Sequence, residues 1–225
     1  MFRRNYLTKQ LERLTVTLHR ILFNKEHLPQ GEVQPLLEEA SRHLLGMNLK
    51  SLQALSSKDI LELLTYNGST DTAKALVISD IFASQGELYR ENGEPDEAYR
   101  SHVKALDLLL ALQAPEHVED ADVAKETALR IGQGLERLRS WVLPASMQLE
   151  LFAYWEEQGE YAKAEDTLFH YMEDHPELVT AAVAQGTLFY ERLLDKTAEE
   201  LHAGNFTREE AGEGLELLKK KLSLL

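Results

Sequence analysis

The 225-residue sequence contains no cysteine and no long apolar run, and these two absences exclude several classes of protein. Without cysteine the chain forms no disulfide, no thiolate metal site and no cysteine nucleophile, which fits a cytoplasmic setting. The longest apolar run, residues 108–112, is far shorter than the ~20 residues of a transmembrane helix. The basic residues after Met1 are followed by no apolar segment, so the sequence predicts no signal peptide.

Sequence patterns typical of β-strands are also missing. Valine and isoleucine are sparse and do not alternate with polar residues, whereas leucine, alanine, glutamate, lysine and arginine are abundant, so an all-α fold is predicted. Ser56 with Asp59, and Thr207 with Glu210, have the spacing of helix-capping boxes. Besides two short helices in "NLKSLQALS" and "SKDILELL" and a last helix after Thr207, we expect helices over residues 2–27, 33–45, 70–91, 95–112, 117–139, 144–158, 161–173 and 178–203.

The predicted turn at Asn67-Gly68 separates an N-terminal helical region, residues 1–68, from a helical body, residues 69–225. Six basic and two acidic residues give residues 1–28 a net charge of +4, so the −14 of the whole chain leaves −18 for the rest. So acidic a body repels nucleic-acid phosphates and anionic lipid, and neither a nucleic acid nor a membrane is expected as a partner.

The basic first helix carries one apolar stripe. Its members follow one another at spacings of four and three residues, which places them on a single helix face. Such a stripe docks on its own chain or pairs with the same stripe of a second copy in a homodimer. The residues of this stripe are Leu7, Leu11, Leu14, Leu18 and Ile21.

Two of the predicted helical hairpins have similar sequences. When Gly93 of "GELYRENGEPDEAYRSHVKAL" is aligned with Gly159 of "FAYWEEQGEYAKAEDTLFHYMEDHP", Tyr89 meets Trp155, Ala98 meets Ala164 and His102 meets Leu168. The two turns are 66 residues apart, which is close to two periods of a ~34-residue helical repeat. A turn glycine halfway between them is missing, because Glu126 stands there within strongly helical sequence.

These spacings resemble the tetratricopeptide repeat. The resemblance implies antiparallel helical hairpins stacked as a short α-solenoid, here with an N-terminal helical extension, and small residues such as Gly86 and Ala98 facing each other where two helices approach closely. The matching residues are Gly86, Tyr89, Gly93, Ala98 and Ala105 in the first hairpin, and Leu151, Trp155, Gly159, Ala164 and Pro176 in the second.

The whole chain also resembles a group of uncharacterised bacterial proteins of about this length. The resemblance rests on an N-terminal helix of the type "YLxxxLExLTxxLxxILF" and on the segment "LLGMNLKSLQALSSKDILELL". It implies a helical fold and a bacterial cytoplasmic setting, and it implies no activity.

No catalytic or metal-binding pattern is found in the sequence. The chain has no HExxH, Walker A or GxSxG motif. Glu39 with His43, and Asp166 with His170, are four residues apart, which is typical of pairs on the surface of a helix. We therefore predict no enzymatic activity, no metal and no cofactor.

The predicted function is that of a non-enzymatic scaffold or adaptor that binds a protein or peptide. Tetratricopeptide-like arrays bind partners along the groove lined by the first helix of each hairpin. The acidic residues expected along that groove favour a basic or amphipathic partner. The alternative is a homo-oligomeric structural or regulatory protein assembled through the N-terminal helix. The predicted partner-binding residues are Asp80, Glu87, Arg90, Phe152 and Glu156.

Overall fold

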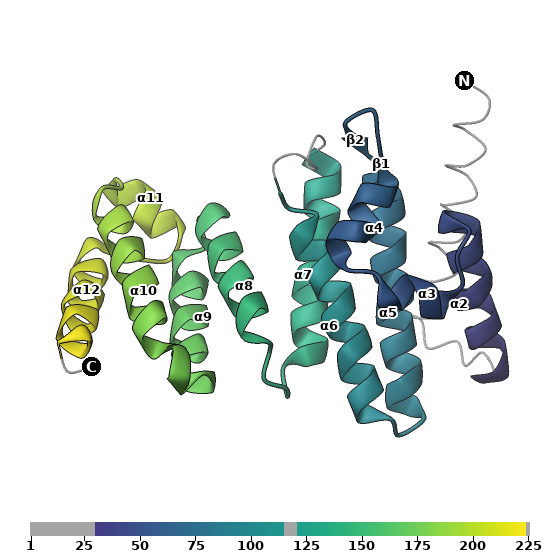
Figure 1. The fold of residues 1–225 in the computed structure, drawn as a ribbon. Coiled ribbons are helices and arrows are strands. Elements are labelled where there is room, and N and C mark those ends of the chain that lie inside the picture. The colour runs from purple at the N-terminus through teal and green to yellow at the C-terminus, as the bar shows by residue number, and fades with distance from the viewer. Residues whose placement is uncertain (1–29, 115–120, 224–225) are drawn as a thin grey trace. The chain divides into compact units, whose positions relative to one another are not determined.

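The computed structural model describes residues 30–114 and 121–223, which form eleven α-helices, one short 3₁₀-helix and one small β-ladder (Figure 1). The predicted all-α class is therefore confirmed. The chain divides into two compact units, Met1–Trp141 (unit 1) and Val142–Leu225 (unit 2). This division differs from the boundary predicted at residue 68, because the helices before that turn pack against those that follow it.

Unit 1 is built around one central helix. Its described helices are α2 (Gln30–Leu45), α3 (Leu49–Ala54), α4 (Ser57–Leu64), α5 (Thr72–Glu91), α6 (Pro95–Ala111) and α7 (Ala121–Leu138). Helix α5 packs against α2, α4, α6 and α7, and its residues 75–86 are all buried, so this helix is the core of the unit. A left-handed Gly93 (φ 76°) ends the turn after α5, and Pro95 opens α6, since proline lacks the N–H that a first helical turn cannot use.

The turn at Asn67-Gly68 closes a β-hairpin that the sequence analysis did not predict. Strands β1 (Thr65–Tyr66) and β2 (Ser69–Thr70) pair in antiparallel fashion. Both turn residues have positive φ, 52° and 77°, which is the conformation that suits a two-residue hairpin. With two residues in each strand, the hairpin is too short to show an alternating pattern. Upstream of it, the predicted capping box of Ser56 and Asp59 is confirmed at the start of α4.

Unit 2 consists of two helical hairpins with one apolar core. It contains α8 (Ala145–Glu157), α9 (Tyr161–Asp174), the 3₁₀-helix η1 (Pro176–Leu178), α10 (Val179–Leu194), α11 (Ala198–Ala203) and α12 (Arg208–Leu222). Helix α8 packs against α9, and α10 packs against α12. Phe189 lies at the centre of the core, with ring centroids 5.2 Å from Phe152 and 6.5 Å from Phe206.

The prediction of a single helix over residues 178–203 is wrong, because α10 ends at Leu194 and a separate helix follows. Thr197 starts a new helix, α11, with a capping box: its side chain accepts from the Glu200 N–H, and the Glu200 carboxylate accepts from the Thr197 N–H. The surrounding residues are good helix formers, which hides this start in the sequence. The predicted capping box of Thr207 and Glu210 at the start of α12 is confirmed.

The close approach of α5 and α6 involves a different pair from the one predicted. Gly86 faces His102 rather than Ala98: a Cβ at Gly86 would lie 2.5 Å from Cε1 and 2.6 Å from Nδ1 of the imidazole. Only glycine therefore fits under this ring.

Candidate functional site

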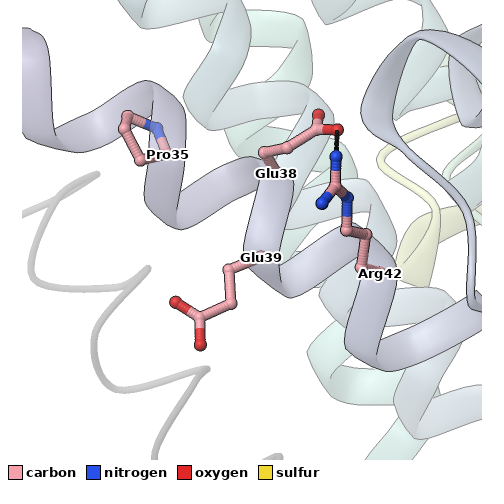
Figure 2. Close-up of a pocket in the computed structure, with 4 residues that line it drawn as sticks. All are labelled: Pro35, Glu38, Glu39 and Arg42. Atoms are coloured by element: carbon pink, nitrogen blue, oxygen red, sulfur yellow. Dashed lines mark hydrogen bonds and ion pairs between the residues drawn. The ribbon is translucent and has the colours of Figure 1, made fainter.

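Among residues 30–114 and 121–223, no group of three or more histidine, aspartate or glutamate side chains is placed to hold a metal ion. One pocket of about 410 Å³ borders Pro35, Glu38, Glu39 and Arg42 on α2 (Figure 2). Arg42 donates to Glu38 Oε1 at 3.2 Å, and the other oxygen of Glu38 accepts from the Leu49 N–H at 3.0 Å. Figure 2 shows Glu39 extending away from this pair. The central carboxylate of the pocket is thus occupied by contacts that join α2 to α3.

The predicted binding residue Asp80 lies in a buried ion pair. Its carboxylate on α5 receives two hydrogen bonds from Arg130 on α7, from Nε at 3.0 Å and from Nη2 at 3.1 Å. Asp80 is only 8% exposed, and Arg130 also donates to Glu126 at 2.5 Å. Burial by itself lowers the pKa of the Arg130 guanidinium, but the bonds with Asp80 and Glu126 raise it on balance. Asp80 therefore joins two helices of unit 1.

A second ion pair lies two turns further along the same helices. Glu87 on α5 has its Oε1 3.4 Å from Nε of Arg137 on α7, and its Oε2 is 2.8 Å from Nη2 of Arg90. The two acids are seven residues apart on α5, and the two arginines are seven residues apart on α7. The two helices therefore run in the same direction with matching spacing. We call Asp80–Arg130 and Glu87–Arg137 the ion-pair ladder. The ladder pairs Asp80 and Glu87, which were predicted to bind a basic partner, with arginines of the same unit.

A buried histidine lies beside the ladder. His102 on α6 is 1% exposed, its Nε2 lies 3.6 Å from Glu87 Oε1, and its Nδ1 has no hydrogen-bond partner. Burial lowers the pKa of His102 to about 4; Glu87 opposes this shift, whereas Arg137 and Arg90 add to it. His102 was not among the residues predicted from the sequence, although its alignment with Leu168 places a histidine at an apolar position.

In unit 2, one predicted binding residue is buried and another is partly exposed. Phe152 is 5% exposed and packs edge-on against Phe189, so it belongs to the core. Glu156 on α8 receives two hydrogen bonds from Arg192 on α10, at 2.6 and 2.7 Å. This pair lies at the rim of a hollow.

The hollow has a volume of about 830 Å³ and lies where α8 and α10 end. Two of its four carboxylates are paired: Glu156 with Arg192, and Glu200 with Lys196 at 3.9 Å. Glu157 and Asp195 have no ion pair within the described part of the chain. The hollow thus keeps an excess of two negative charges, next to helix C-termini that also favour cations. Its lining includes Ala153, Glu156, Glu157, Arg192, Asp195 and Lys196.

The leucine stripe of residues 7–21 lies outside the described residues, as does the whole helix predicted over residues 2–27. None of the helices in residues 30–114 and 121–223 has the length and apolar character of a membrane span.

Comparison with known proteins gives a family. No curated protein and no solved structure matches the chain significantly. A family model does match, over residues 1–223, and its description is "Family of unknown function (DUF6483)". Because this match covers nearly the whole chain, the predicted membership of an uncharacterised family of about this length is confirmed. The protein belongs to the family of unknown function DUF6483.

Proposed function

We propose that this protein is a non-enzymatic helical scaffold of the tetratricopeptide type, which binds a segment of another protein on the face shared by α8 and α10 of unit 2. The observation that supports this proposal is the acidic hollow of about 830 Å³ at the ends of these two helices. Its volume is within the range of ligand-binding pockets.

Two side-chain contacts between α8 and α10 support the comparison with a tetratricopeptide groove. Phe152 contacts Phe189, and Glu156, one turn later, pairs with Arg192, about one turn after Phe189. The two helices therefore run in the same direction, as the first helices of successive repeats do. Helix α8 is followed by α9, which packs against it, and α10 packs against α12, which comes after the short α11.

The exposed side chains on this face define the partner that fits it. Ala153 is exposed on α8, and Leu188, one turn before Arg192 on α10, is 50% exposed. Apolar surface beside Glu157 and Asp195, which form no ion pair with residues 30–114 or 121–223, suits an amphipathic segment that carries basic side chains. Glu87 and Asp80, which were predicted for this role, are paired inside unit 1 instead.

A peptide-binding experiment tests the proposal. The probe is a fluorescent 18-residue helical peptide with leucine on one face and arginine on the other, and the control peptide carries glutamate in place of arginine. We expect saturable binding of the arginine peptide only, weakened by salt because surface charges are screened. Ala153→Arg, which fills the hollow and adds a positive charge, should weaken binding about tenfold or more, equivalent to about 1.4 kcal/mol.

The matched control is Ala181→Arg, which adds the same side chain at an exposed position near the start of α10, away from the hollow. It should leave binding unchanged. Equal binding of both peptides, or equal loss in the two variants, would contradict a docking site at the hollow.

A further inference from the structure

His102 occupies a position of α6 where an apolar side chain would be expected, because its neighbours are buried and apolar. Its neighbours one turn away on α6, Ala98, Ala105 and Leu106, are buried apolar residues. Its ring lies directly against Gly86 of α5. The aligned residue of the second hairpin, Leu168, is fully buried in an apolar core.

The charged groups that face the ring come from two other helices. Helix α5 contributes Asp80, Glu87 and Arg90, and α7 contributes Arg130 and Arg137. Only Glu87 is near enough to attract an imidazolium, and its distance of 3.6 Å from Nε2 is too long for a hydrogen bond. Both Arg90 and Arg137 already share this carboxylate. A protonated His102 would therefore be a third cation beside the single carboxylate of Glu87.

At most one water molecule has room to stabilise the protonated ring in place. The void beside it, bordered by Asp80, Arg130 and Arg137 among others, measures about 10 Å³. That is about the size needed for a single water molecule. A buried charge without adequate partners is strongly disfavoured, so protonation requires the interface to open.

We propose that His102 makes the packing of α7 onto α5 and α6 sensitive to acid, so that protonation of this one side chain releases α7 while unit 2 stays folded. The neutral ring fits between Gly86 and the ladder. The imidazolium competes with Arg137 for Glu87 and is repelled by both arginines near that carboxylate. Release of α7 uncovers the acidic face of α5.

The size of the effect follows from proton linkage. In the closed state the pKa is lowered to about 4, whereas a solvated histidine has a pKa of about 6.5. The open state therefore binds more protons between these values, so the contribution of neutral His102 to closure is fully present above pH 6.5 and decreases as the pH falls toward 4. From pH 7.5 to pH 5.0 the equilibrium constant for opening should rise about 30-fold.

Hydrogen exchange followed by mass spectrometry on the full chain tests this inference. Protection factors, which correct for the intrinsic exchange rate at each pH, are compared at pH 7.5 and 5.0. Because an isolated helix of 18 residues is marginal in water, α7 should unfold once it is released. We therefore expect its peptides to lose about 30-fold in protection, while peptides of α9 and α10 in unit 2 serve as the internal reference. The loss should be absent in both His102→Gln and His102→Leu, two variants that differ in polarity and so guard against misfolding of either one.

The control variant is His170→Gln, because His170 is exposed on α9. It should retain the full acid-dependent loss in α7. The inference is overturned if the loss persists in both His102 variants, if the wild-type protein shows none, or if unit 2 loses protection to the same extent as α7.

Discussion

Two glycines of α12, two residues apart, provide a direct test of how unit 2 is packed. A Cβ at Gly214 would overlap the ring of Tyr190, whose Oη would be 2.6 Å away, whereas a Cβ at Gly212 meets no atom within 4 Å. Tyr190 is fully buried, and its hydroxyl donates to Glu165 at 2.5 Å, so the ring cannot move aside without breaking that bond. We therefore compare Gly214→Ala with Gly212→Ala.

The expected difference between the two variants isolates the steric cost. Each substitution gains about 1 kcal/mol of helix propensity, because both glycines lie inside the same helix. This gain cancels when the two variants are compared. What remains is the cost of forcing a methyl group into a filled core, about 1–3 kcal/mol. Gly212→Ala should be more stable than the wild type, and Gly214→Ala should be less stable than Gly212→Ala by that amount.

Urea denaturation monitored by circular dichroism and by tryptophan fluorescence, in a Trp141→Phe background that leaves Trp155 as the one tryptophan, measures this difference. Trp155 lies on α8, packed against the unit 2 core, and therefore reports on the unit that contains both glycines. If Gly214→Ala proves as stable as Gly212→Ala, then α12 does not approach Tyr190 of α10 as closely as the structure shows.

Three further predictions concern other parts of the chain. Asp80→Asn should destabilise unit 1 by about 3 kcal/mol in urea denaturation, because it leaves Arg130 buried without its main partner. Glu136→Gln, which breaks an exposed pair with Arg139, should change stability by less than about 0.5 kcal/mol. Thr197→Ala should cost about 1 kcal/mol through loss of the α11 cap, while Thr180→Ala, exposed in α10, should cost nothing measurable by thermal denaturation. The assembly predicted for the leucine stripe is tested by light scattering: deletion of residues 1–28 should halve the mass per particle if a homodimer forms through it, and an unchanged oligomeric state with an intact fold would refute that role.

Local patterns allowed much of the helical architecture to be predicted from the sequence. Gly93 and Gly159 mark hairpin turns because the chain there needs a positive φ that glycine adopts without strain. The capping boxes at Ser56 and Thr207 could be recognised because each couples a side chain to a backbone N–H three residues away. The box at Thr197 follows the same rule, but it was missed because strong helix formers surround it.

The features that depend on contacts between distant helices could not be predicted in this way. Asp80 and Glu87 look like exposed groove acids in the sequence, and only the packing of α7 shows that arginines 50 residues later neutralise them. The hollow between the ends of α8 and α10 likewise depends on two helices whose contact is invisible in sequence. Of the five predicted binding residues, Glu156 is the one that lines this hollow.

The ion-pair ladder also fixes how far α7 can slide along α5. Its two ion pairs are seven residues apart, or about 10.5 Å along each helix axis, so they hold the two helices together at two separate axial positions. A slip of α7 by one helical turn, about 5.4 Å, would put both arginines out of reach of both acids at once. Breaking one rung leaves the other as a pivot, about which α7 can tilt but not slide. A motion of α7 that leaves one of these ion pairs intact is therefore expected to be a swing about that pair, with the axial position of the helix unchanged.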